Sequence, residues 1–434
     1  MNKTYYSQNE IVEKELFDAN RLNNYVETFS FPRLAGTDGE KRSVELTVET
    51  FKKIGFNDKQ IKERSFKFSD FYSTTLIKLI MILNLTFNLV LILFAYINIL
   101  LSIFHIALMV LIVSFIIKGL KHPETPGFWG EYFGETFTAT NVFTKIPAKQ
   151  LDEEEAGNII ISAHLDSKSQ SINTYWRVFF YRVWIYGGIG LGIFYILYLI
   201  IIITNLEFDF RLTLYGAWVT VILISLSNIF LMFLDTHNKS PGALDNASGM
   251  AVVFELSSHL IKNPLKNFNI WICQFSAEEL GTMGSRIFVN EHESKFIYGR
   301  AFQFNFDMVS CKPHNKNRLE YFRSYGTIIR KKCAPLLSKY VEIAAKKEKV
   351  EIQGLHLSSG AHTDTVPFHL RNLDGIDIST KAAALYTHTK NDTPEKVDPK
   401  VLADSCKVIY TAILMIDEDY EDLCKNNELV CEVK

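Results

Sequence analysis

Charged side chains are missing from long stretches of this 434-residue sequence. Residues 79–117 contain no Asp, Glu, Lys or Arg over 39 consecutive positions. At about 1.5 Å per residue, this stretch is too long for one membrane-spanning helix and suits two of roughly 20 residues, with a turn near Asn98. Residues 183–206 and 212–234 are two further charge-free stretches. Because soluble helices of this length normally keep a polar face, the sequence predicts four transmembrane helices in two hairpins.

The chain also lacks paired cysteines, a large net charge and an apolar N-terminal segment. Its six cysteines are scattered and include no C-x-x-C pair, which favours reduced thiols over a disulfide framework or a zinc knuckle. The 46 basic and 48 acidic residues nearly cancel, so nothing indicates a nucleic-acid partner. The first 24 residues are strongly polar and do not read as a secretory signal.

Polar and small residues interrupt the apolar stretches at a few positions. We expect three polar side chains at membrane depth to bond between helices: Asn84, Asn88 and His105. We expect a small-residue face for close helix packing in the third span, made by Gly188 and Gly192 with Gly187 and Gly190 beside them.

The two apolar inserts divide the rest of the chain into three segments. We expect one soluble domain assembled from residues 1–73, 121–175 and 235–434, with the hairpins at 74–120 and 176–234. In these segments, strand-like runs alternate with helical runs. This alternation predicts an α/β architecture with a mostly parallel central sheet flanked by helices.

Three strand-like runs are followed directly by side chains that bind metals. His164 follows one run, the Glu278-Glu279 pair follows another, and Asp307 follows a third. Ligand sites in parallel sheets lie at the carboxyl ends of the strands, so these groups are expected to meet. Asp245 lies in a loop bracketed by glycines, residues 241–249, that leads into an apolar helix. By itself Asp245 would read as a helix cap, but its position between these groups and His388 favours a metal site.

A carboxylate can bridge two divalent ions, each of which needs further nitrogen or oxygen ligands. With Asp245 as the bridge, each ion would have three protein ligands and open positions for water and substrate. The four terminal ligands would be His164, Glu279, Asp307 and His388. Adjacent Glu278 and Glu279 cannot easily bind the same ion from one turn, so one of them is free to act as a base.

These residues lie in segments that resemble the zinc aminopeptidases of the aminopeptidase Y and bacterial leucyl aminopeptidase type. That group also includes glutamate carboxypeptidase and glutaminyl cyclase relatives. The resemblance covers nearly all of the soluble portion and implies a three-layer, zinc exopeptidase-like fold. The matching segments are 31–37 (FPRLAGT), 163–167 (AHLDS), 241–249 (PGALDNASG), 278–285 (EELGTMGS), 305–309 (NFDMV), 363–368 (TDTVPF) and 388–393 (HTKNDT).

Carried over by position, the resemblance implies a role for each site residue. One zinc ion would be held by His164, Asp245 and Asp307. The other would be held by Asp245, Glu279 and His388. Glu278 would be the general base, and Asp166 would orient His164. The substrate pocket would be shaped by Asp364, Pro367 and Phe368. The implied cofactors are two Zn²⁺ per chain, and Co²⁺ or Mn²⁺ would suit the same ligands.

The expected function is a membrane-embedded zinc aminopeptidase that hydrolyses N-terminal residues from peptides, using metal-activated water and Glu278 as base. Two alternatives are a glutaminyl cyclase-like acyltransferase with one zinc ion and an inactive, peptidase-like membrane scaffold. The complete ligand set argues against a scaffold, and the Asp245-Asn246 pair with the double ligand set favours a peptidase. No expected ligand lies within 74–120 or 176–234, so the inserts are expected to anchor the domain without forming the site.

The chemistry also constrains the topology. Ligands before and after the second insert must meet, so that insert is expected to return to its starting side of the bilayer. The N-terminal segment resembles part of the same domain, so the first insert is expected to return as well. The charges on the domain side of the spans are mostly basic: Lys78, Lys118, Lys121, Arg177, Arg182 and Lys239. The opposite side has only Glu207, Asp209 and Arg211. Because the positive side is normally cytoplasmic, we expect a four-span integral membrane protein with a cytoplasmic catalytic domain, acting on peptides at a lipid bilayer.

Overall fold

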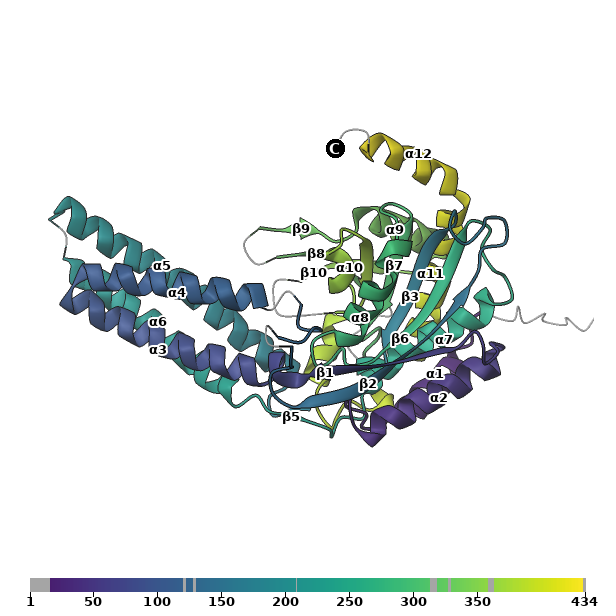
Figure 1. The fold of residues 1–434 in the computed structure, drawn as a ribbon, viewed down its shortest axis with the longest axis horizontal. Coiled ribbons are helices and arrows are strands. Elements are labelled where there is room, and N and C mark those ends of the chain that lie inside the picture. Colours follow the sequence, from purple (N-terminus) through teal and green to yellow (C-terminus); the bar gives the residue numbers. More distant parts are fainter. Residues whose placement is uncertain are drawn as a thin grey trace, which may run out of the picture.

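The computed structural model of the protein describes residues 16–119, 122–127, 130–207, 209–312, 318–326, 329–357 and 363–431, without the side chains of 426–431. Lys121, one of the expected flanking charges, lies outside the described residues. The chain forms an α/β domain from which four long helices project (Figure 1).

A nine-stranded sheet lies at the centre of the domain. Its order is β1-β2-β6-β3-β7-β11-β8-β10, with β9 paired to β8. The strands are β1 (Lys62–Ser69), β2 (Thr136–Ile146), β3 (Gly157–His164), β6 (Phe268–Phe275), β7 (Ala301–Phe306), β8 (Leu319–Tyr325), β9 (Lys331–Lys332), β10 (Ile352–Leu357) and β11 (Asp374–Ile378).

The sheet is parallel in the middle and mixed toward its edges. Strands β6, β3, β7 and β11 run parallel to one another. Strands β1 and β2 are antiparallel to their neighbours, and β8 is antiparallel to β11 but parallel to β10. Strands β3, β6 and β7 are buried along their whole length, which explains why their sequences are nearly continuous apolar runs.

Helices cover both faces of the sheet, which confirms the expected α/β class. Alternate residues of β3 face the two layers: Ile159 and Ile161 pack in the larger core, and Ile160 packs in the smaller one. The larger core includes side chains from α1 (Ala19–Phe29), α2 (Asp38–Ile54), α7 (Ser248–Leu260), α9 (Pro335–Lys347) and α11 (Pro399–Glu418). The smaller core includes side chains from α8 (Met283–His292) and α10 (Val366–His369). The last helix, α12 (Tyr420–Cys431), follows α11.

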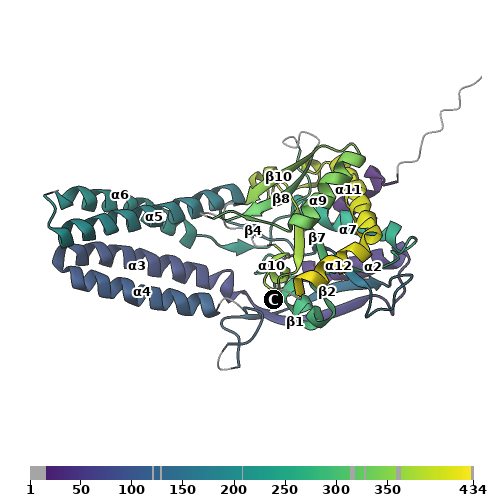
Figure 2. The same ribbon diagram turned by 90° about the horizontal axis from the view of Figure 1, so that it is seen from above.

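The four projecting helices form two hairpins, as the charge-free stretches predict. They are α3 (Thr75–Ile97), α4 (Ile99–Gly119), α5 (Thr174–Thr204) and α6 (Phe210–Met232). All four are long and apolar enough to cross a membrane. They extend together from one side of the domain (Figure 2). Large apolar side chains on their outer faces are exposed. Examples are Leu100, Phe104 and Ile203, with exposed fractions of 70%, 68% and 71%. Apolar surface of this extent marks contact with lipid or another apolar partner.

Polar side chains join the helices within this bundle. The Oδ1 atom of Asn84 on α3 accepts hydrogen bonds from Asn88 (3.0 Å), from Trp184 on α5 (2.9 Å) and from Asn228 on α6 (2.9 Å). The Nε2 atom of His105 on α4 lies 3.2 Å from the Phe87 carbonyl oxygen on α3. Asn84 and His105 are therefore bonded between helices, as expected, whereas the bond from Asn88 stays within α3.

The small-residue packing face uses two of the four expected glycines, Gly187 and Gly190. A Cβ atom at Gly187 would lie 2.6 Å from Ile224 on α6, and one at Gly190 would lie 3.1 Å from Thr220. Nothing lies within 4 Å of a Cβ atom built at Gly188 or Gly192. The close contact between α5 and α6 therefore uses Gly187 and Gly190, because only that side of α5 faces its partner.

Candidate metal centre

The central strands deliver polar groups to one edge of the sheet. His164 is the last residue of β3, Glu278 and Glu279 follow β6, and Asp307 follows β7. Because these three strands are adjacent and parallel, their carboxyl ends lie side by side. His388 reaches the same edge from the loop after the short helix η4 (Lys381–Leu385), with a φ of 63°.

Asp245 lies in an irregular turn, η2 (Ala243–Ala247), that leads into α7. The turn begins at Gly242, whose φ is 64° and where a Cβ atom would lie 2.5 Å from the Ser167 side chain. A larger residue would therefore displace the turn. The peptide bond between Asp245 and Asn246 is cis. The Asn246 amide donates to the Phe306 carbonyl (2.7 Å) at the end of β7, which holds the turn against that strand.

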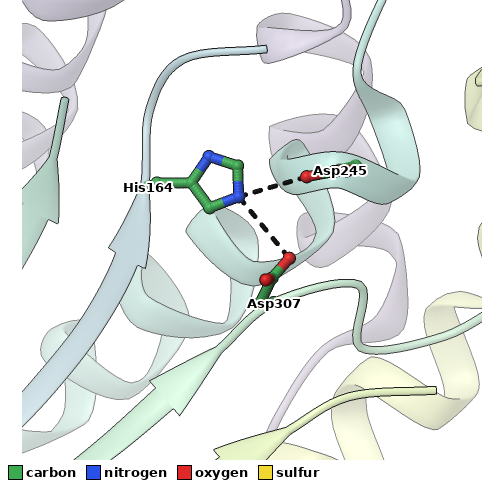
Figure 3. A group of neighbouring side chains, drawn as sticks. All are labelled: His164, Asp245 and Asp307. Carbon is green, nitrogen blue, oxygen red and sulfur yellow. Dashed lines mark ion pairs between the residues drawn. The ribbon is translucent and has the colours of Figure 1, made fainter. Parts of the chain in front are cut away.

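Two groups of three ligand atoms meet at Asp245. In the first, the Nε2 atom of His164 lies 3.1 Å from Oδ1 of Asp245 and 3.5 Å from Oδ1 of Asp307 (Figure 3). In the second, Nε2 of His388 lies 3.2 Å from Oδ2 of Asp245 and 3.1 Å from Oε2 of Glu279. The ligand atoms of each group lie within 4.8 Å of one another, and all five residues are buried.

The chemistry of this cluster fits bound cations. Buried His164 Nε2 and Asp307 Oδ1 point into the first group but have no hydrogen-bond partner among the described residues. Imidazole nitrogen and carboxylate oxygen are common zinc ligands. The cluster also gathers an excess of buried carboxylates, and buried charge of one sign needs compensation. Metal ions held by these two groups would satisfy both requirements.

Glu278 lies beside the two groups without belonging to either. It is buried and lines the same cavity as Asp245, Glu279 and His388. Burial, with a contribution from the nearby carboxylates, raises the pKa of Glu278 well above its usual range. Its carboxyl group is therefore suited to hold a proton. The preceding residue, Ala277, has a φ of 57°, so the chain turns sharply between β6 and the Glu pair.

Asp166 contacts more of the site than the sequence indicated. His164 Nδ1 lies 3.1 Å from the backbone carbonyl oxygen of Asp166 and 3.5 Å from its carboxylate. The two carboxylate oxygens accept the backbone N–H groups of Glu278 (3.2 Å) and Glu279 (3.3 Å). Asp166 therefore positions the Glu pair with its side chain and orients His164 mainly with its backbone.

A buried arginine holds the loops of the site together. Arg33, in the segment between α1 and α2, has no exposed surface. Its guanidinium donates to the backbone carbonyls of Leu165 (2.8 Å), Pro241 (2.7 Å) and Gly242 (2.8 Å). Burial lowers the pKa of Arg33 to about 10, so it remains protonated at neutral pH. Arg33 thus ties the His164 loop to the Asp245 turn.

Asp392 supports the same turn from the opposite side. Its carboxylate accepts the backbone N–H groups of Leu244 (2.5 Å) and Asp245 (3.2 Å). Burial and the neighbouring Asp245 charge raise the pKa of Asp392 to about 8. The sequence motifs contain both Arg33 and Asp392, but the motifs alone do not show which groups they bind.

Sequence reasoning missed three residues that contact the second group of ligands. The Lys168 ammonium lies 2.7 Å from Oε2 of Glu279. His388 Nδ1 lies 3.0 Å from the Thr174 hydroxyl and 3.1 Å from the Gln170 side-chain oxygen. The only available sequence signal was proximity, because Lys168, Gln170 and Thr174 follow the His164 motif within ten residues.

The expected substrate-pocket residues lie behind the cavity. Phe368 packs in the smaller core, with its ring centroid 6.2 Å from that of Phe296. Asp364 and Pro367 are also buried, and Thr363 is the residue of this segment that lines the cavity beside the metal ligands. A packed core side chain offers no surface to a substrate, so this position does not suit the expected role of Phe368.

A cavity of about 450 Å³ opens beside the two groups of ligands. One side is formed by Glu278 and four of the ligand residues: Asp245, Glu279, Asp307 and His388. The other is formed by the first turns of α3 and α5, including Leu76, Ile77, Val178 and Tyr181. The expectation that the inserts stay outside the site is therefore wrong for the cavity wall, because both hairpins begin at the edge where the strands end.

Part of the chain is similar in sequence to a known peptidase family and to two aminopeptidases. Residues 230–413 match the model of peptidase family M28. The chain is 28% identical over 186 residues to aminopeptidase YwaD of Bacillus subtilis (strain 168), covering 41% of this chain and 38% of that protein. It is 35% identical over 77 residues to the probable lipoprotein aminopeptidase LpqL of Mycobacterium tuberculosis, covering 18% and 15%. The aligned part thus spans less than half the length of these relatives.

Solved structures share the fold across most of the chain. An aminopeptidase from Aneurinibacillus sp. strain AM-1 has a TM-score of 0.52 and 14% identity, covering 92% of this chain and 93% of that one. The zinc aminopeptidase BSAP from Bacillus subtilis has a TM-score of 0.52 and 15% identity, covering 92% and 94%. A glutaminyl cyclase from an Acidobacteriales bacterium has a TM-score of 0.50 and 14% identity, covering 96% and 99%. The family resemblance and the fold class expected from the sequence are confirmed.

Proposed function

We propose that the protein is a membrane-bound, zinc-dependent aminopeptidase that uses two metal ions to hydrolyse N-terminal residues from peptides. The observation that carries this proposal is the pair of buried ligand groups that share Asp245. The match to the M28 model and the similarity to aminopeptidases support the reaction class.

Each proposed role follows from a position in the site. One ion would be held by His164, Asp245 and Asp307, and the other by Asp245, Glu279 and His388. When bound, two zinc ions polarise a carbonyl group and lower the pKa of water. Glu278, which lines the cavity beside both groups and belongs to neither, would take the proton of the attacking water and return it to the leaving amine.

The same proposal assigns a layout to the chain. Residues 1–73, 121–175 and 235–434 form the peptidase domain, and 74–120 and 176–234 form hairpins that cross the bilayer. The four apolar helices support this division. The basic residues at their domain ends support a cytoplasmic catalytic domain.

A glutaminyl cyclase-like acyltransferase is the second candidate, because proteins of that activity share the fold. The two activities differ in metal requirement and product. A peptidase releases a free amino acid and consumes water. A cyclase acts on peptides with N-terminal glutamine, and its product retains every residue.

The test uses the full chain purified in detergent and loaded with zinc. It is incubated with Leu-Ala-Ala, with the N-acetylated form of that peptide, and with Gln-Ala-Ala. We expect free leucine from the first peptide only, loss of activity with a chelator, and two zinc ions per chain. Cyclised glutamine without release of free amino acids would favour the second candidate. A zinc-loaded protein inert toward all three peptides would support the scaffold alternative.

A further inference from the structure

The cavity beside the proposed metal ligands is continuous with the apolar hairpins. On α3, the lining residues Leu76, Ile77 and Ile80 share one face, because positions three and four apart are neighbours on a helix. On α5, Thr174, Val178 and Tyr181 share a face in the same way, and Arg177 lines the cavity beside them. The α5 face starts at Thr174, whose hydroxyl lies 3.0 Å from Nδ1 of His388. An apolar wall therefore runs from the ligand group toward the helix bundle.

The length of α5 indicates the depth of this wall in the bilayer. With 31 residues, α5 is about 46 Å long, whereas a hydrocarbon core is about 30 Å thick. Its charge-free part begins only at Val183, after Arg177 and Arg182. The first nine residues of α5 therefore extend beyond the hydrocarbon, and four of them line the cavity: Thr174, Arg177, Val178 and Tyr181.

Charged and aromatic side chains lie beside the first residues of α5, where the helix is expected to leave the hydrocarbon core. Lys78 on α3 pairs with Asp235, just after α6, at 2.5 Å. Tyr175, Trp176 and Phe179 on α5 are about half exposed, at 53%, 50% and 46%. Aromatic and basic residues concentrate where a membrane protein passes through the headgroup layer. The cavity thus lies at the bilayer surface, between the catalytic groups and the lipid.

We propose that the preferred substrate is a peptide with apolar residues near its N-terminus that is bound to the membrane surface. The free N-terminus reaches the metal ligands while the following apolar side chains contact the α3 and α5 wall. This inference rests on the proposed aminopeptidase activity and adds the substrate class. Burying an apolar side chain against such a wall favours binding.

The experiment compares two peptides that release the same residue, Leu-Leu-Phe-Leu-Lys and Leu-Ala-Ser-Ala-Lys, using the full chain in lipid vesicles. Wild type is expected to prefer the apolar peptide by about tenfold or more in kcat/KM. The double variant Leu76→Ala/Ile80→Ala should lower this preference about tenfold. The matched control, Leu79→Ala/Ile82→Ala, changes exposed residues of the same helix (48% and 45%) and should leave the preference unchanged.

Two further measurements separate the possible explanations. The apolar peptide with a C-terminal acyl chain, which binds it to vesicles, should be cleaved faster than the free peptide; equal rates would rule out delivery from the membrane. Zinc content checks that the variants are folded, and Val178→Ala tests the opposite wall if the double variant fails to fold. An unchanged preference in variants that bind zinc would overturn the proposed wall. No release of leucine from either peptide would instead overturn the aminopeptidase activity itself.

Discussion

Glu278 differs from its neighbour Glu279 in what surrounds it. The Glu279 carboxylate lies against His388 and Lys168, whereas burial keeps the pKa of Glu278 high. Glu278→Gln should lower kcat at least about 10²-fold while zinc stays near two per chain, because the change removes the base and no ligand. A peptide assay measures kcat, and zinc analysis measures the number of ions per chain. Glu279→Gln is the comparison variant and should lose zinc. A Glu278→Gln protein that lost its zinc, or kept full activity, would contradict the assigned role.

Glu40 on α2 is a buried acid whose contribution depends on pH. Its Oε1 accepts hydrogen bonds from the Thr140 N–H (2.9 Å) and the Ser276 hydroxyl (2.9 Å), and burial raises its pKa to about 7. In the unfolded chain the ordinary value is 4.5. The folded state therefore holds the proton more tightly. Its stabilising effect is complete below pH 4.5 and is lost as the pH rises through about 7.

Glu40→Gln should remove this dependence, because an amide oxygen can accept both hydrogen bonds without ionising. We expect the variant to gain stability relative to wild type as the pH rises from 5 to 8, by at most about 3 kcal/mol. The difference in apparent Tm between the variant and wild type, measured in detergent across this pH range, reports this difference in stability. Glu45→Gln, an exposed change on the same helix, is the control. A difference that stays constant or narrows with rising pH would refute the assignment.

At the level of elements, α5 links the membrane-type helices to the proposed ligands. The Thr174 hydroxyl at its first residue contacts His388, as does Gln170 from the short strand β4 (Ser169–Gln170). Strand β4 pairs with β5 (Thr236–His237), just after α6, so the hairpin is closed at its base. A shift of α5 would therefore move the His388 contacts directly.

Thr174→Val should weaken metal binding at the His388 group about tenfold, because hydrogen bonds that orient a ligand histidine typically have effects of this size. Dialysis against zinc buffers should show one ion lost earlier than in wild type, while the other is retained. Thr204 lies at the far end of the same helix, where its hydroxyl bonds to the Ile200 carbonyl and to no other described residue, so Thr204→Val should bind zinc normally. Equal zinc loss in both variants, or in neither, would argue against a positioning role for Thr174.

For the whole molecule, the site requires each hairpin to leave and re-enter the same side of the bilayer. Single cysteines at Asn98 and Asn205, in the two hairpin turns, in a chain without other cysteines, should react with an impermeant thiol reagent on intact cells. A cysteine at Asp58, an exposed residue of the peptidase domain, should react only after lysis. This pattern is expected if the basic residues at the domain side lie in the cytoplasm. The opposite pattern would place the catalytic domain outside.

The local sequence determined the class of each element. Stretches of about 20 residues without charge leave a helix no polar face, so the four apolar helices follow from composition alone. The alternation of strands and helices placed His164, Glu278, Glu279 and Asp307 at one edge of the sheet, because parallel strands end together. The alternation of strands and helices did not place His388 at this edge, because no strand precedes it directly.

Only the tertiary structure decided which groups bind one another across long sequence separations. Arg33 reaches Gly242, and Thr174 reaches His388, over more than 200 residues. Sequence periodicity predicts which face of a helix or strand is apolar, but it does not predict which other segment packs against that face. Phe368, which the family resemblance assigned to the substrate pocket, lies in the core, while Leu76 and Val178, which the sequence assigned to the membrane hairpins, line the cavity. The packing of the hairpins against the edge of the sheet set these positions.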